Sequence, residues 1–330
     1  MWPEFARSFE QSQPERVLVS CANWLGLTDK DEADNLNRAK AIETVDCPVI
    51  SFGLGVQARL EKEPPKLGSN TLRLAKALAE RCEMLSVRDQ LTKNTLEAAG
   101  IYNAVVTGCP SNFINTDPGL GKKIAARAQL KMSSTDWSQL RINISEAQGG
   151  HPRSAQVLVK TMEILEDSPA FYLIQSPDLL PFLFGENEQI PGFYKNNAFM
   201  DEPSRLSQLL RAKALHFVHM DAWLDFARTC DISFGMRLHG TVVPLQAGVP
   251  SALIAHDSRT VGLAEHMGIP WISPEDFVQS YAEEPALLLR FIADKMSGYD
   301  TRRRKLAAVM DGTIRANGLV PNEMLTRLAG

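Results

Sequence analysis

The sequence predicts an α/β fold made of two Rossmann-like domains with parallel sheets. Short apolar runs rich in β-branched residues alternate with helical segments along most of the 330 residues. Such alternation is typical of βαβ units, in which each crossover helix brings the next strand back parallel to the last. The alternation breaks over 116–138, where glycines, lysines and serines accumulate. We therefore expect an interdomain connection there, with an N-terminal domain over 1–130 and a C-terminal domain over 131–330.

The expected strands of the first domain are short apolar runs, some of which end in glycine. They are RVLVSC, CPVISFGLG, MLSVRD and NAVVTG, at 16–21, 47–55, 84–89 and 103–108. Helices with mixed charged and apolar spacing are expected between them, over 29–45, 68–82 and 90–100. Ser69 or Asn70 fits the N-cap of the second helix, and Gly100 fits the position after the end of the third.

The second domain repeats this alternation. The expected strands are 141–145, 170–176, 215–219, 231–235, 250–256 and 271–273. The expected helices are 152–167, 203–214, 221–230, 240–250 and 258–268, with 286–296 and 301–318 in the C-terminal tail. In an open parallel sheet, ligands bind beyond the carboxyl ends of the strands. The loops that follow the strands are therefore the places to look for functional residues.

Composition excludes several classes of protein. A formal net charge of −4 argues against a nucleic-acid-binding domain, since these are usually basic. No run of apolar residues approaches the ~18 of a membrane span, and the N-terminal residues do not resemble a signal peptide. Five scattered cysteines without a CxxC pair are typical of reduced thiols in a cytoplasmic protein. The six histidines form no helical metal-ligand pair, so we expect no structural metal.

Three loops of the first domain carry candidate residues. GLGVQA at 53–58 lacks the third glycine of a dinucleotide-binding loop, and a tight turn is the favoured interpretation. Arg88 ends the SVRD strand, either as an anion ligand or as a structural partner of Asp89. The loop TGCPSNF contributes Ser111 and Asn112 as candidate ligands. A nucleophilic Cys109 in the same loop would need a histidine from the second domain, because none occurs in the first 150 residues.

The strongest signal is SFGMRLHG at 233–240. Arg237, His239 and Gly240 follow an apolar strand and open an apolar helix, whose N-terminus presents free N–H groups and a positive dipole end. Arginine adds a planar cation suited to phosphate or carboxylate. The helix dipole favours a neutral imidazole while a bound anion favours imidazolium, which suits a proton-transfer group. The alternative is a histidine that caps the helix beside a salt-bridged arginine.

AHDSRT at 255–260 repeats this arrangement one unit later. His256, Asp257 and Arg259 follow a strand and open a helix, with Asp257 or Ser258 as its N-cap. Capping alone is the alternative. Because neighbouring strand ends meet at one sheet edge, we expect these residues and His239 to line one cleft between the domains, with Arg88 across it.

These segments resemble the polysaccharide pyruvyl transferases. The likeness covers roughly residues 16 to 272. It rests on SFGMRLHGTVVPLQAGVPSALIAHDSRT with GLAEHMGIP, on LSVRD, on CPVISFGLGVQ and on VVTGCPSNFIN. It implies two Rossmann-like domains of the GT-B type, with the acceptor side in the first and the donor side in the second. It also implies transfer of pyruvate from phosphoenolpyruvate onto two hydroxyls of one sugar, as a cyclic ketal.

The resemblance also suggests partners and roles. The acceptor would be a lipid- or nucleotide-linked precursor of an exopolysaccharide or cell-surface glycan, handled at the inner face of the membrane, with peripheral membrane contact. Phosphoenolpyruvate serves as the donor substrate, and no cofactor is expected. Arg237 and His239 fall on the family's donor-binding and catalytic positions. Arg237, Arg88 and Arg259 would then hold the anions, with His239 as acid or base and Asp257 as the alternative base. His256, Gly240, Ser111 and Asn112 complete the expected site.

The chain departs from the family pattern at its start, where no Asn-x-Gly-Asp turn precedes RVLVSCANWLGL. The first βα units are therefore expected to be missing, which shortens the N-terminal domain. A shortened sheet exposes an edge strand, and exposed edges recruit partners. A homodimer is the resulting expectation.

Two other functions remain open from the sequence. One is a GT-B glycosyltransferase that uses a nucleotide sugar, and the other is a non-catalytic relative that binds an anionic glycan. The segment 179–197 is expected to shape acceptor choice. Its aromatic residues would stack on sugar rings, approach lipid or form a hydrophobic flap; they are Phe182, Phe184, Phe193 and Tyr194.

Overall fold

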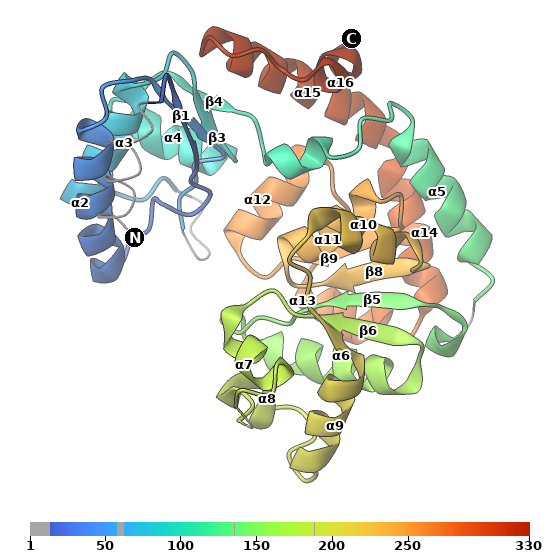
Figure 1. Cartoon of the computed structure of the whole chain (residues 1–330). Helices are drawn as coiled ribbons and strands as arrows, with labels where there is room; N and C mark the ends of the chain where they lie inside the picture. The colour runs from blue at the N-terminus through green and yellow to red at the C-terminus, as the bar shows by residue number, and fades with distance from the viewer. Residues whose placement is uncertain (1–13, 58–62, 135, 188) are drawn as a thin grey trace. The chain divides into compact units, whose positions relative to one another are not determined.

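The computed structural model describes residues 14–57, 63–134, 136–187 and 189–330 (Figure 1). It confirms the α/β class with parallel sheets. Its contacts divide the chain into two compact units. The first comprises Met1–Thr116, Asp257–Met267 and Arg303–Gly330, and the second comprises Asp117–His256 and Gly268–Arg302. This division differs from a single boundary near residue 130, because segments far apart in the sequence share a core.

The first unit holds four parallel strands in sequence order. They are β1 (Val17–Ser20), β2 (Val49–Phe52), β3 (Leu85–Val87) and β4 (Ala104–Val106). β1 pairs with β2 and β3 with β4, and a parallel bridge between Leu54 and Val87 joins the two pairs. Among the described strands, only β2 pairs with β1, whose Leu18 is 60% exposed.

Helices cover this sheet as the sequence pattern predicts. They are α2 (Asp29–Glu43), α3 (Ser69–Glu80) and α4 (Gln90–Ala98), followed by the 3₁₀ turn η1 (Pro110–Phe113). Thr28 caps α2 in a reciprocal capping box with Asp31, and Asp89 caps α4. The N-cap of α3 is Gly68, one residue before the expected Ser69. Gly100 has a φ of 82°, which only glycine adopts at little cost, and it follows α4 as expected.

The second unit is built on six parallel strands in the order β10-β9-β8-β5-β6-β7. Their bounds are β5 (Ile142–Ser145), β6 (Ala170–Leu173), β7 (Ala214–Leu215), β8 (Ile232–Gly235), β9 (Ser251–Ile254) and β10 (Trp271–Ile272). β6 and β7 follow β5 on one side, and β8, β9 and β10 follow on the other, which is the doubly wound Rossmann order. The reversal lies between β5 and β8, so the loops that follow these two strands flank the switch point.

The helices of the second unit connect these strands. They are α5 (Leu120–Lys131), α6 (Ser154–Asp167), α7 (Leu180–Leu183), α8 (Gly192–Lys195), α9 (Pro203–Lys213), α10 (Met220–Arg228), α11 (Leu238–Gln246), α13 (Pro274–Asp276) and α14 (Pro285–Lys295). Short 3₁₀ or π turns add η2 (Trp137–Gln139), η3 (Pro177–Leu179), η4 (Phe277–Tyr281) and η5 (Met296–Gly298). No helix in the described part of the chain is long and apolar enough to cross a membrane.

Two segments differ from the sequence expectation. Residues 116–138 contain helix α5, which packs on α14. Gly119 is the N-cap of this helix, and the buried residues after it recur at helical spacing. The expected strand 215–219 is reduced to the two residues of β7. Phe217 instead packs against Phe226, at 5.3 Å between ring centroids, and this draws the chain away from the sheet edge.

The last helices belong with the first unit. They are α12 (Ser258–Met267), most of α15 (Tyr299–Ala316) and α16 (Glu323–Ala329). Ala307, Met310, Leu325 and Leu328 form a small core against Phe52 and Phe113. Asn317 also accepts hydrogen bonds from the backbone N–H groups of Glu83 and Met84. The C-terminal helices thus complete the core of the N-terminal sheet.

Candidate active site

Arg237 lies at the switch point of the second unit. It is the N-cap of α11, two residues after the end of β8, and its side chain is 27% exposed. Its Nη1 donates to Gln148 Oε1 at 3.0 Å, and its Nε lies 3.5 Å from Glu146 Oε2. Both partners follow β5, so the guanidinium spans the gap between the β5 and β8 loops. Among the described residues, none accepts a hydrogen bond from Nη2, which leaves this donor for a ligand.

Glu146 is the buried partner that sequence reasoning missed. Its carboxylate accepts backbone N–H groups of Gln175 at 2.9 Å and Ser176 at 2.8 Å, and also the hydroxyl of Ser176. The residue is 1% exposed. These hydrogen bonds offset the cost of burying a polar carboxyl group. The available signal was a single charged residue placed directly after the apolar strand INIS.

Two tyrosines extend this network. The Tyr194 hydroxyl donates to Glu146 Oε1 at 3.2 Å and lies 3.0 Å from the hydroxyl of Tyr172. The backbone N–H of Ala147 donates to Tyr172 at 2.7 Å. Burial raises the pKa of both phenols, so both stay neutral hydrogen-bonding groups at physiological pH. Since Tyr194 belongs to α8, the 179–197 segment is tied to the residues that hold Arg237.

The aromatic residues of 179–197 therefore divide by burial. Phe182 and Tyr194 are 1% and 3% exposed and pack in the core, so they do not offer faces to a sugar. Phe184 is 62% exposed, and its ring meets that of His216 edge-on at 6.4 Å between centroids. Phe193 is half-buried. Two of the four aromatic residues thus anchor the segment in the core.

His239 lies in the first turn of α11 and is exposed. The helix N-terminus there carries the partial positive charge of the dipole and unpaired N–H groups. The backbone N–H of Arg237 donates to Ser145 Oγ at 3.3 Å, and Asn143 Nδ2 donates to the carbonyl of Gly240 at 3.3 Å. These contacts fix the start of α11 on β5, and with it the positions of Arg237 and His239.

Gly240 has a packing role at this point. A Cβ added to it would overlap Ser145 Cβ and lie 2.6 Å from Gln175 Oε1. Glycine therefore lets α11 approach β5 closely enough for Arg237 to reach Glu146. The expectation that Gly240 binds substrate stays a prediction. The close approach of Gly240 to β5 explains on structural grounds why a glycine is needed at this position.

Gly240→Ala is expected to destabilise the protein by about 1–3 kcal/mol, because the added methyl group overpacks a dense contact. Gly312→Ala is the matched control. Gly312 lies inside α15, where a Cβ would meet nothing within 4 Å. This substitution should stabilise by about 0.5–1 kcal/mol. Urea unfolding of the two variants measures both effects, and equal stability of Gly240→Ala and the parent would contradict the packing argument.

In the first unit, three predicted residues gather around Asn23, which sequence reasoning missed. The Asn23 Oδ1 accepts from Arg88 Nη1 and, at 3.3 Å, from Arg259 Nη1. Arg259 Nη2 lies 3.4 Å from Asp257 Oδ2. Asp257 also caps α12 through its Oδ1, which accepts the N–H of Thr260 at 2.7 Å. The structure thus brings Arg88, Asp257 and Arg259 together.

Arg88 is 3% exposed. Its guanidinium donates to the carbonyls of Ala22 and Val56 as well as to Asn23, and its Nε donates to Asp89 at 3.1 Å. Burial lowers the pKa of Arg88. With these donors satisfied, Arg88 has the contacts of a structural arginine that joins the ends of three segments, which was the alternative interpretation of SVRD.

The remaining predicted residues are spread over both units. His256 follows β9, next to β8 in the sheet of Arg237, and is 7% exposed. Ser111 and Asn112 lie in η1 after β4, where Ser111 Oγ donates to Cys109 Sγ at 3.0 Å and Asn112 is 1% exposed. The expectation that all these residues line one cleft stays a prediction.

The cysteines and the potential metal-ligating side chains of the described residues lie apart from one another. Among them, no group of three or more His, Cys, Asp or Glu side chains is placed to hold a metal ion. The five cysteines form no disulfide. Burial raises the pKa of Cys21 to about 12 and that of Cys82 to about 11, so neither thiol is a thiolate at neutral pH.

Fold and site together define a class, a Rossmann-type α/β protein with an arginine and a histidine at the switch point of its six-stranded sheet. The chain belongs to the polysaccharide pyruvyl transferase family, whose family model matches residues 6–258. The resemblance seen in the sequence is thus confirmed. Membership places the chain among transferases of polysaccharide biosynthesis.

Other comparisons gave more distant likenesses. A search of curated proteins found no match. Among solved structures, a UDP-GlcNAc 2-epimerase from Neisseria meningitidis bound to UDP-GlcNAc is similar at a TM-score of 0.43 and 13% identity, over 94% of this chain and 79% of that one. A UDP-N-acetylglucosamine 2-epimerase from Rickettsia bellii is similar at a TM-score of 0.45 and 12% identity, over 95% of this chain and 78% of that one.

Proposed function

We propose that the chain transfers pyruvate from phosphoenolpyruvate onto two hydroxyls of one sugar in a glycan precursor, as a cyclic ketal. The observation that carries the proposal is the Arg237–Leu238–His239 sequence at the start of α11, beside the switch point. Family membership supplies the reaction class. The acceptor is proposed to be a lipid- or nucleotide-linked precursor of an exopolysaccharide or cell-surface glycan.

Arg237 is proposed to bind an anionic group of the donor. Phosphoenolpyruvate carries a phosphate and a carboxylate, and either group suits a guanidinium and the first-turn N–H groups of a helix. Glu146 and Gln148 fix the Nε and Nη1 edge of Arg237 and leave Nη2 for the ligand. The Glu146 carboxylate also offsets the charge of Arg237, so a second cation would strengthen donor binding. Arg259, whose side chain is 23% exposed, is proposed to bind an anionic group as well.

The proposed reaction balances without a cofactor. One acceptor hydroxyl adds through its oxygen to C2 of phosphoenolpyruvate, and its proton passes to a base. The methylene carbon C3 gains a proton and becomes the methyl group. The second hydroxyl then replaces phosphate at C2 and loses its proton, which closes the ketal and releases inorganic phosphate. We assign proton transfer to His239, with Asp257 as the alternative base.

Thermal unfolding with candidate donors tests this function. A ligand present at about 100 times its Kd stabilises the folded protein by about 2.7 kcal/mol. We expect phosphoenolpyruvate to raise the Tm, and UDP- or GDP-sugars to leave it unchanged. A Tm shift with nucleotide sugars but none with phosphoenolpyruvate would favour a glycosyltransferase. A shift with an anionic glycan alone would favour a non-catalytic binding protein.

Two partners belong to the same proposal. Peripheral contact with the inner face of the cytoplasmic membrane is supported by apolar side chains exposed after β6 and β7: Phe184, Val218 and Met220 are 62%, 79% and 44% exposed. A vesicle flotation assay would detect this contact.

A homodimer through the outer edge of β1 is supported by the exposed Leu18. Light scattering at increasing concentration would detect that, and a monomer throughout would contradict it.

A further inference from the structure

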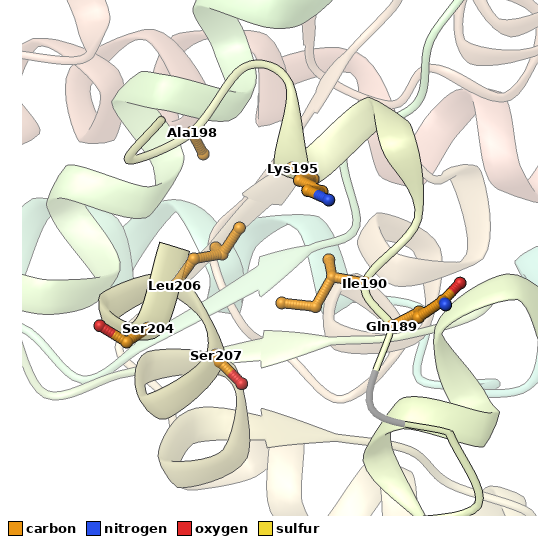
Figure 2. A pocket seen from close by; sticks show the side chains of 7 residues that line it. All are labelled: Gln189, Ile190, Lys195, Ala198, Ser204, Leu206 and Ser207. Atoms are coloured by element: carbon orange, nitrogen blue, oxygen red, sulfur yellow. The ribbon is translucent and has the colours of Figure 1, made fainter. Parts of the chain in front are cut away.

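A cavity of about 450 Å³ lies in the second unit between the 189–198 segment and the first turns of α9 (Figure 2). This volume falls within the ~300–1,000 Å³ of typical small-molecule sites. Its lining includes Gln189, Ile190, Lys195, Ala198, Leu206 and Ser207. None of these residues belongs to the site around Arg237. The cavity therefore has room for a separate ligand group.

The lining combines an apolar centre with a polar rim. Figure 2 shows the side chains of Ile190 and Leu206 facing each other from opposite sides of the cavity, with Lys195 above Ile190. Lys195 is exposed, and among the described residues no carboxylate forms an ion pair with its ammonium. A pyranose ring has an apolar face of C–H groups and a rim of hydroxyls, which matches this arrangement. An unpaired ammonium adds a preference for a sugar that carries a carboxylate.

The backbone beside the cavity is strained. Phe199, next to Ala198, has a φ of 49°, and it is the only residue other than glycine with a positive φ in the described part of the chain. Such a conformation costs on the order of 1–3 kcal/mol and persists where the surroundings impose it. Arg205 lies over the Phe199 ring at 4.5 Å and pairs with Glu166 at 2.6 Å. These contacts hold the cavity wall in a fixed shape.

The cavity is connected to the Arg237 site through α8. Lys195 lines the cavity, while the preceding Tyr194 points into the core and donates to Glu146 at 3.2 Å. Glu146 in turn lies 3.5 Å from Arg237. The 189–198 segment comes from the loop after β6, so it belongs to the same carboxyl edge of the sheet as Arg237. The cavity and Arg237 thus share one edge of the sheet and are linked through Tyr194 and Glu146.

We propose that the cavity binds a carboxylate-bearing sugar of the acceptor glycan, next to the sugar that receives pyruvate. The carboxylate pairs with Lys195, the ring packs on Ile190 and Leu206, and the hydroxyls bond to Gln189 and Ser207. This inference rests on the proposed transferase function, because it names part of the acceptor of that reaction. It makes Lys195 a specificity-determining residue.

Saturation-transfer NMR with methyl β-glucuronide and methyl β-glucoside tests the proposal on the full chain. The glucuronide should bind up to about 5-fold more tightly than the glucoside, because Lys195 is exposed and an exposed ion pair contributes up to about 1 kcal/mol. Lys195→Met should remove this difference, and Ser207→Trp should abolish binding of both sugars by filling the cavity. Lys122→Met is the matched control, an exposed lysine of α5 in the same unit, and should bind like the parent.

Equal binding of the two sugars, or a glucuronide signal unchanged by Lys195→Met, would overturn the assignment. Phosphoenolpyruvate is titrated against the same samples to separate the two proposals. If phosphoenolpyruvate binds but the glucuronide does not, the cavity assignment fails and the transferase function stands. If the glucuronide binds in a Lys195-dependent manner and phosphoenolpyruvate does not, the cavity is an anionic-sugar site and the proposed donor is wrong.

Discussion

His239→Ala is expected to lower kcat by about 10²–10⁴, the usual contribution of a positioned acid or base. His239 is exposed in the first turn of α11, so its truncation leaves no cavity. Alanine is also the strongest helix former. The variant should therefore keep the stability of the parent and bind phosphoenolpyruvate with little change. The measurement is phosphate released from phosphoenolpyruvate in the presence of the acceptor glycan, per folded molecule.

His219→Ala is the control for this experiment. His219 is likewise exposed, lies at the N-cap of α10 and makes no side-chain capping bond. It shares the residue type and the helix-start position but not the switch point, so its removal should leave kcat unchanged. Should folded His239→Ala turn over like the parent, His239 takes no part in proton transfer and the proposed mechanism fails.

Arg237→Ala is expected to weaken phosphoenolpyruvate binding by about 10- to 100-fold, which corresponds to a charge-assisted contact of about 1.5–3 kcal/mol. The variant should still fold. Glu146 keeps its hydrogen bonds from Gln175, Ser176 and Tyr194, so the lost cation does not leave a bare buried charge. Calorimetric titration with phosphoenolpyruvate gives the affinity directly.

Two further variants sharpen this prediction. Arg237→Lys keeps the charge but cannot contact Glu146 and Gln148 with one planar fork, so we expect it to recover only part of the affinity. Arg228→Ala removes an exposed arginine that pairs with Asp225 on the surface of α10, and exposed pairs contribute little. It should bind phosphoenolpyruvate like the parent. An undiminished affinity of Arg237→Ala would remove this residue from the donor site.

Local sequence patterns determined the fold class of this protein and the position of its main candidate site residues. The βα alternation, the helices expected over 29–45 and 90–100, and the placement of Arg237 and His239 at the start of a helix were all predicted from the sequence. Each depends on neighbours within a few residues: apolar spacing, a capping side chain, or a glycine after a strand. The class of the fold and the position of the strongest site signal therefore followed from the amino-acid order.

The tertiary structure decided the partners of those residues. Glu146 meets Arg237 from 91 residues away, because β5 and β8 are neighbours in one sheet and end at the same edge. Asn23 meets Arg259 from 236 residues away, because the start of α12 packs with the first unit. Burial showed that the donors of Arg88 are used within the protein. Packing placed α12 and the C-terminal helices with the first unit. Such long-range choices depend on which apolar surfaces meet in the folded chain, and no local pattern records them.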